Sequence, residues 1–105
     1  MFNIPDMMKK AQEVQGQLQS IQQDLRNRTT TGESGAGMVK VVVTGAQELV
    51  SIEIEASILQ ADNKKMVEDL VIAAVNNGLH NSRTMAETEM KKVTSLLPNI
   101  PGLPF

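Results

Sequence analysis

The chain has 105 residues, enough for one domain with a modest hydrophobic core. It contains no cysteine, which excludes disulfides and thiolate chemistry, and its formal net charge of −2 gives no overall attraction to nucleic acid. No run approaches the roughly 18 apolar residues of a membrane span, and the first ten residues lack the apolar segment of a secretion signal. We therefore expect a soluble, cytoplasmic protein without a membrane partner.

A first helix is predicted over residues 4–27, because Pro5 and Asp6 both favour a first helical turn. Apolar residues then recur three and four positions apart, an unbroken heptad pattern that predicts a narrow packing seam. The other faces are rich in glutamine. The seam could pack on the chain's own core or on another helix. Its members are Met7, Ala11, Val14, Leu18, Ile21 and Leu25.

A glycine-rich segment follows at 32–37, after a β-branched stretch at 28–32 that favours a short strand. Glycines at this density indicate positive φ or a tight turn, and they also raise the question of phosphate binding. Phosphate loops run from a strand through glycines into a helix, whereas here a strand follows the glycines. Lys40 lies inside that strand and does not close a G-K-[ST] signature. The segment is therefore interpreted as a hairpin turn.

Two further strands are predicted at 38–44 and 49–55, where apolar and polar residues alternate. A four-residue loop at 45–48 would make them an antiparallel hairpin with one buried and one exposed face. The expected register pairs Thr44 with Leu49 beside the loop. It then pairs Val43 with Val50, Val41 with Ile52 and Val39 with Ile54 on one buried face, and Lys40 with Glu53 on the exposed face.

A second, longer helix is predicted over 63–97, with Asp62 as its N-cap and Pro98 ending it. Its apolar stripe is interrupted at 76–82 and resumes at Met85, Met90 and Val93. Such a helix is about 50 Å long at 1.5 Å per residue, whereas a seven-residue strand covers only about 23 Å. The overhanging apolar residues need another surface, and a second copy of the chain would supply it.

Together these elements predict an α+β fold of α-β-β-β-α order. It is a three-stranded antiparallel meander covered on one face by helices, with a long C-terminal helix, assembled as a homodimer. Residues 1–97 form a single domain, and residues 98–105 form an apolar, proline-rich tail.

Catalytic chemistry is not indicated. His80 is the single histidine, which cannot by itself make a triad or a metal site. Glu53 and Glu55 share a strand face without a histidine or aspartate partner. We expect no enzyme activity, metal, cofactor or small-molecule substrate. The two aromatic residues, Phe2 and Phe105, give no platform for stacking bases.

Charge is distributed unevenly along the chain. Residues 1–28 carry four basic and three acidic groups, residues 29–62 carry one and five, and residues 63–105 carry five and four. The acidic excess therefore lies in the sheet, and the lysines occur in pairs near helix ends. Helical lysine pairs are commonly a solvated surface, so DNA binding requires that these clusters share a face.

Two motifs, TGESGAGMVKVVVTGA at 31–46 and MVEDLVIAAVNN at 66–77, occur in an order and at a separation that resemble the YbaB/EbfC family of nucleoid-associated proteins. The resemblance extends to the PGLPF ending. It implies a homodimer whose paired helices project like tweezers and bind double-stranded DNA in the nucleoid with limited sequence preference. Family members commonly carry basic residues after the V-N-[ND] segment, where this chain has Leu79-His80-Asn81-Ser82. The phosphate contacts that the resemblance suggests are Lys9, Lys10, Arg26, Arg28, Lys64, Lys65, Arg83, Lys91 and Lys92.

A different class of function stays open, namely a protein-interaction or chaperone-like module that grips clients with its helical arms. The overhanging Met85 and Met90 would suit such a role, although the first helix is short for a coiled-coil tentacle. Salt separates the two hypotheses, because DNA affinity falls steeply with salt whereas capture of apolar clients does not.

Overall fold

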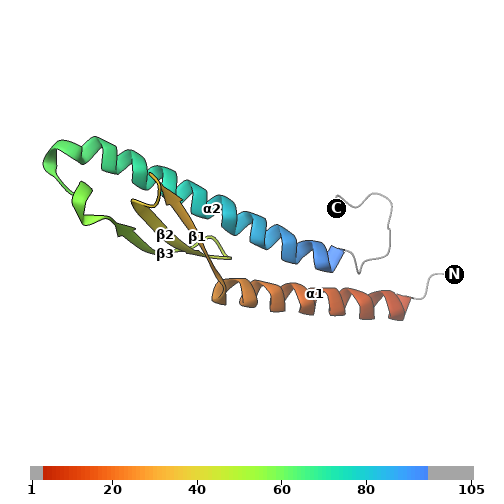
Figure 1. Cartoon of the computed structure of the whole chain (residues 1–105). Coiled ribbons are helices and arrows are strands. Elements are labelled where there is room, and N and C mark those ends of the chain that lie inside the picture. Colours follow the sequence, from red (N-terminus) through yellow and green to blue (C-terminus); the bar gives the residue numbers. More distant parts are fainter. Residues whose placement is uncertain (1–3, 95–105) are drawn as a thin grey trace.

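The computed structural model describes residues 4–94, and its elements follow the predicted order. The helices are α1 (Ile4–Asn27) and α2 (Lys64–Thr94). The strands β1 (Thr29–Ser34), β2 (Val39–Thr44) and β3 (Leu49–Ile54) form one antiparallel sheet in the order β1-β2-β3, and two 3-10 turns, η1 (Ala56–Ile58) and η2 (Ala61–Asn63), lead into α2. α2 lies along the sheet, whereas α1 projects from its end (Figure 1). The fold is α+β, as predicted, and measures 71 × 25 × 16 Å.

The second half of the glycine-rich segment, residues 35–37, forms the turn between β1 and β2, whereas residues 32–34 belong to β1, which extends beyond its predicted end at 32. Gly35, Ala36 and Gly37 all have positive φ, at 59°, 54° and 88°. The backbone N–H of Gly37 donates to the carbonyl of Ser34 at 3.2 Å, which closes the turn. The chain continues into an antiparallel strand, so the prediction of a hairpin turn is confirmed.

The second hairpin is one residue tighter than predicted. The backbone N–H of Thr44 donates to the carbonyl of Glu48 at 2.8 Å, so Thr44 is bonded to Glu48 rather than Leu49, and Gln47 adopts a φ of 64° in the turn. A β-bulge at Val50 then absorbs the missing residue and restores the predicted register from Ser51 onward. The predicted pairs of Thr44 with Leu49 and of Val43 with Val50 are therefore wrong. The observed partners are Val39 with Ile54, Lys40 with Glu53, Val41 with Ile52, Val42 with Ser51 and Val43 with Leu49.

Small residues bring α2 close to β1. Ala74, Gly78 and Ser82 are spaced by four residues, so they share one helix face, and all three are buried. A Cβ on Gly32 of β1 would lie 2.5 Å from the carbonyl oxygen of Ala74 and would collide with the backbone of Gly78. The Ser82 hydroxyl donates to the carbonyl of Thr44 at 2.7 Å. The predicted interruption of the apolar stripe is therefore a point of close helix–sheet packing.

Asparagines of α2 also bond the outer edge of β1. The Nδ2 of Asn81 donates to the carbonyl of Thr31 at 2.9 Å, and the backbone N–H of Glu33 donates to the Oδ1 of Asn77 at 3.2 Å. These bonds occupy backbone groups that an edge strand leaves open. The outer edge of β3 pairs with no strand of the described chain.

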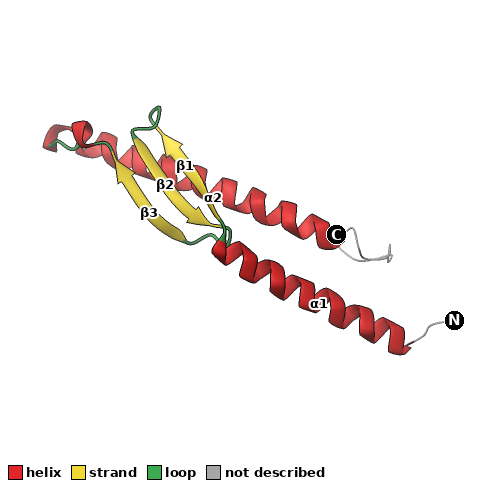
Figure 2. Cartoon of the chain, turned by 60° about the horizontal axis from the view of Figure 1, so that its bottom comes forward, coloured by secondary structure: helices red, strands yellow, loops and turns green. Residues whose placement is uncertain are grey.

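The core lies between α2 and the two strands it crosses. Alternate valines of β2 are fully buried there, together with Ile58 and Ala74. A helix is about 10 Å wide and strands are about 4.8 Å apart, so one helix covers about two strands. The predicted burial of β3 is therefore wrong within this chain for Val50 and Ile52, which are 59% and 42% exposed, whereas Ile54 is half-buried against the core. Leu49, beside the turn, is also 45% exposed. Figure 2 shows β3 as the strand farthest from α2.

The heptad seam of α1 is covered only near the sheet. α1 does not lie on the sheet as the prediction of covering helices implied; its last turns contact α2, and its first turns project freely (Figure 2). Leu25 is 6% exposed and Val93 of α2 is 3% exposed. The other seam residues grade outward: Val14, Leu18, Ile21 and Met85 are half-buried, and Met7, Ala11 and Met90 are exposed.

α2 begins a little differently from the prediction. Asp62 does not cap it, because Asp62 lies inside η2 and the helix begins at Lys64. The predicted end at residue 97 and the tail at 98–105 lie outside the described residues. Neither helix, in the part of the chain that the structure describes, is long and apolar enough to cross a membrane.

Candidate nucleic-acid interface

All nine basic residues suggested as phosphate contacts lie outside the sheet and are exposed. The sequence alone did not place them relative to one another. In the structure they follow the two helices along the long axis of the molecule. They are Lys9, Lys10 and Arg26 on α1, Arg28 between α1 and β1, and Lys64, Lys65, Arg83, Lys91 and Lys92 on α2.

The sheet face that points away from α2 is acidic. Glu33, Lys40 and Glu53 lie side by side across the three strands, so one lysine stands between two carboxylates. A hollow of about 220 Å³ on this face is lined by Lys40 together with Glu53 and Glu55. A phosphate backbone is repelled by this arrangement, which leaves the helices as the candidate surface for a polyanion.

The basic residues do not form a single patch. Lys64 and Lys65 lie at the first turn of α2, and Lys91 and Lys92 lie at its last turns, about 40 Å further along the helix axis. The structure does bring Arg28 to Lys92, since both bind the same carboxylate. A single ligand that contacts all these clusters must therefore extend over about 40 Å, and a DNA duplex is long enough to do so.

That shared carboxylate belongs to Glu89, which sequence reasoning missed as a partner. Its Oε1 accepts from Arg28 Nη1 at 2.8 Å and lies 3.0 Å from Lys92 Nζ, and Asp24 lies 3.7 Å from the same guanidinium nitrogen. Hydrogen bonds from Arg28 and then Lys92 lower the pKa of Glu89, and the hydrogen bond to Glu89 raises the pKa of Arg28. The i, i+3 spacing of Glu89 and Lys92 was the one signal in the sequence; the contact with Arg28 depends on how α1 and α2 meet.

Eight of the nine suggested cations thus divide into two groups. Arg28, Lys65 and Lys92 already contact carboxylates, with Lys65 Nζ 3.0 Å from Asp69 Oδ1. A phosphate must compete with these partners. A second group makes no ion pair within residues 4–94 and meets a phosphate without that competition: Lys9, Lys10, Arg26, Lys64 and Arg83.

In the segment at 79–82, where the family resemblance leads us to expect basic residues, two side chains instead hold α2 to the sheet. Asn81 bonds the edge of β1, and Ser82 is buried against the strand end. Arg83, the next residue, is exposed. Arg83 is therefore the basic side chain that this part of α2, residues 79–83, presents to solvent.

Comparison with known proteins agrees with these observations. The sequence profile of the YbaB/EbfC DNA-binding family matches residues 1–97. A nucleoid-associated protein of Thermoanaerobacter pseudethanolicus is 46% identical over 102 residues, which cover 97% of this chain and 91% of that protein. A nucleoid-associated protein of Desulfotalea psychrophila is 39% identical over 102 residues, covering 97% and 95%.

The fold has a counterpart among solved structures. The crystal structure of an uncharacterized protein from Helicobacter pylori superposes with a TM-score of 0.75 at 20% identity, covering 93% of this chain and 100% of that one. At this identity the likeness concerns the fold alone. With the family profile matched along nearly its whole length, the chain belongs to the YbaB/EbfC DNA-binding family.

Proposed function

We propose that the chain binds double-stranded DNA as a homodimer, with little sequence preference, and that it acts in the bacterial nucleoid. Membership of a DNA-binding family over residues 1–97 carries this proposal, and the names of the relatives support the nucleoid as its location. The family is defined by DNA binding and is not a class of enzymes.

The mechanism follows from the charge distribution. Exposed lysines and arginines on α1 and α2 contact phosphates, which supplies affinity but reads no base. The acidic face of the sheet keeps the duplex on the helical arms. Because phosphates are the same in every sequence, such contacts bind unrelated duplexes almost equally. The long axis of 71 Å gives the arms the reach to contact phosphates well apart along a duplex.

A second copy of the chain is the proposed occupant of the apolar surface that α2 leaves open. This β3 surface consists of Leu49, Val50 and Ile52, which stand next to the unpaired edge of the sheet. The other sheet edge is partly occupied, because the N–H of Glu33 and the carbonyl of Thr31 are bonded to Asn77 and Asn81. Three large apolar residues in one exposed strand are an interaction surface. A symmetric pair of such surfaces would bury both.

The experiment is a titration of labelled random-sequence duplexes, followed by fluorescence anisotropy. The double variant K9A/K10A should bind every duplex more weakly and flatten the dependence of log K on log salt by about one unit per lost contact. K40A is the control from the other surface: it removes one exposed lysine charge from the acidic sheet face, and it should bind no more weakly than the unmodified chain.

The chaperone-like alternative makes the opposite predictions. Apolar capture by exposed Met7, Met8 and Met90 would be insensitive to salt and indifferent to K9A/K10A. Equal loss of DNA affinity in K9A/K10A and K40A would contradict contacts on the helices. Absence of duplex binding by the unmodified chain would contradict the proposed function itself.

A further inference from the structure

The exposed side of α1 has two chemically different flanks. The glutamine flank consists of residues spaced three and four apart, which places them in one row along the helix. All are exposed, and the row contains no carboxylate. It ends next to the sheet in a cation that has no ion pair within residues 4–94. Its members are Gln12, Gln15, Gln19, Gln22 and Arg26.

The acidic flank lies on the other side of the apolar seam and holds all three carboxylates of α1. Its spacing is again three and four, with one interval of seven. Its members are Asp6, Lys10, Glu13, Gln17 and Asp24. All members of both flanks are exposed, so exposure does not explain the absence of acids from the first. A phosphate that approaches the glutamine flank meets no carboxylate, whereas on the acidic flank Lys10 is the one cation among three carboxylates.

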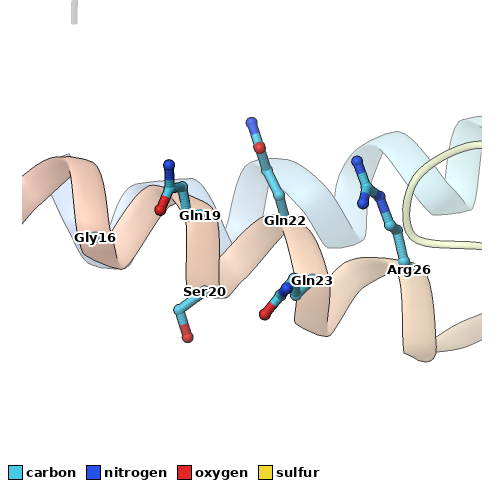
Figure 3. A pocket seen from close by; sticks show the side chains of 6 residues that line it. All are labelled: Gly16, Gln19, Ser20, Gln22, Gln23 and Arg26. Carbon is cyan, nitrogen blue, oxygen red and sulfur yellow. The ribbon is translucent and has the colours of Figure 1, made fainter.

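The glutamine flank borders a shallow, open hollow of about 350 Å³. Gln19, Gln22 and Arg26 of the flank line it together with Gly16, Ser20 and Gln23 of the neighbouring helix row. Gly16 forms part of it, and a Cβ built there would meet nothing within 4 Å. In Figure 3 the side chains of Gln19, Gln22 and Arg26 extend to the same side of the helix. Two amide groups and a guanidinium thus present hydrogen-bond donors in one direction.

We propose that the glutamine flank of α1 is a DNA-contacting surface, on which neutral amides donate to phosphate oxygens beside Arg26. The inference deepens the proposed function, on which it rests, by assigning the contact to one side of one helix. Glutamine side chains are among the groups that bond phosphates in protein–DNA complexes. Because an amide releases no counterion, its share of the affinity does not depend on salt.

The test compares two substitutions that differ only in flank. Gln19→Glu puts a carboxylate on the glutamine flank, and Gln17→Glu puts one on the acidic flank, two residues away on the same helix. Against a labelled random-sequence duplex at about 50 mM salt, we expect Gln19→Glu to lower affinity about tenfold, because a carboxylate facing phosphates is repelled. Gln17→Glu should change it less than about twofold. Because Gln17 is four residues from Glu13, the control Gln17→Glu also places two carboxylates next to each other on the helix. Repulsion within the helix therefore weakens the control and not Gln19→Glu.

A neutral variant supplies a second readout. Gln19→Ala should lower affinity about threefold, the loss of a typical hydrogen bond, and should leave the salt slope unchanged. Arg26→Ala should lower affinity and flatten the slope by about one unit. A flattened slope in Gln19→Ala, or its full affinity, would overturn the assignment of a neutral phosphate contact to Gln19.

The outcomes separate this inference from the function on which it rests. If the unmodified chain binds DNA and the two glutamate variants weaken binding equally, the glutamine flank is not the contact surface, while the proposed function stands. If the unmodified chain does not bind, both are wrong. If Gln19→Glu alone lowers the molar mass in light scattering, the flank packs against protein and the inference is overturned.

Discussion

Gly32→Ala tests the packing of α2 against the sheet. The added Cβ would lie 2.5 Å from the Ala74 carbonyl and would collide with the Gly78 backbone, so no side-chain rotation can relieve it. Overpacking a core costs about 1–3 kcal/mol. Here α2 itself must move, which also weakens the bonds from Asn77 and Asn81 to β1, at about 1 kcal/mol each. We expect a total loss of about 3–5 kcal/mol.

Thermal unfolding followed by circular dichroism measures this loss. A domain of this size changes its Tm by about 4–8 °C per kcal/mol, so Gly32→Ala should lower Tm by at least about 12 °C. The control is Gly16→Ala in α1, where the new Cβ meets nothing within 4 Å. Alanine is better than glycine inside a helix by about 1 kcal/mol, so this variant should be at least as stable as the unmodified chain. A Tm of Gly32→Ala within about 2 °C of the unmodified chain would contradict the helix–sheet contact.

Three further predictions concern single contacts. Ser82→Ala removes the bond to the buried Thr44 carbonyl and should lower the free energy of unfolding by about 1–3 kcal/mol in urea titrations; an unchanged midpoint would contradict it. Glu89 has a lowered pKa, so its contribution to stability is present above the unfolded pKa of about 4.3 and is lost as the pH falls through the folded value. Between the unfolded and the folded pKa of Glu89, Tm should fall more steeply with decreasing pH in the unmodified chain than in Glu89→Gln. Parallel curves of Tm against pH for the two proteins would refute the ion pair. Val50→Glu on the exposed β3 surface should halve the molar mass in light scattering while keeping the helical signal, and an unaffected dimer would exclude that surface as its interface.

The periodicities in the sequence account for the element order and for most of the strand pairing. Strict alternation in β2 and β3 sets which residues share a face, which is why Val41 lies opposite Ile52 and Lys40 opposite Glu53. The turn could not be predicted as well. A positive φ at a glutamine shortens it by one residue, and a bulge at Val50 compensates, so the register is restored.

Coverage of the sheet was beyond sequence reasoning, because a strand pattern says which face is apolar but not how many strands one helix covers. Ile52 has the same pattern as Val41, yet Ile52 is 42% exposed and Val41 is 1% exposed. The polar stretch of α2 was similarly ambiguous. Asn81 and Ser82 interrupt an apolar stripe in the sequence, and their bonds to β1 and β2 become apparent only when Gly78 is seen against Gly32.

The candidate site depended most on tertiary arrangement. The distribution of charge along the sequence distinguishes an acidic sheet from basic helices, and the family resemblance suggests DNA as the ligand. Neither shows that Glu89 contacts Arg28, since 61 residues separate them and the contact requires α1 to meet the end of α2. The three- and four-residue spacing of the glutamines on α1 can be seen in the sequence. One flank of this helix lacks carboxylates and the other holds three, and this difference becomes informative only because the structure shows that both flanks are exposed.

The most direct test of the account is the affinity of the unmodified chain for random-sequence duplex DNA, measured by anisotropy across a series of salt concentrations. Some six phosphate contacts per dimer predict a slope of log K against log salt near −5, with unrelated duplexes competing almost equally. No measurable binding at about 50 mM salt with micromolar protein, or binding that does not weaken with salt, would contradict recognition of the phosphate backbone by the helical arms.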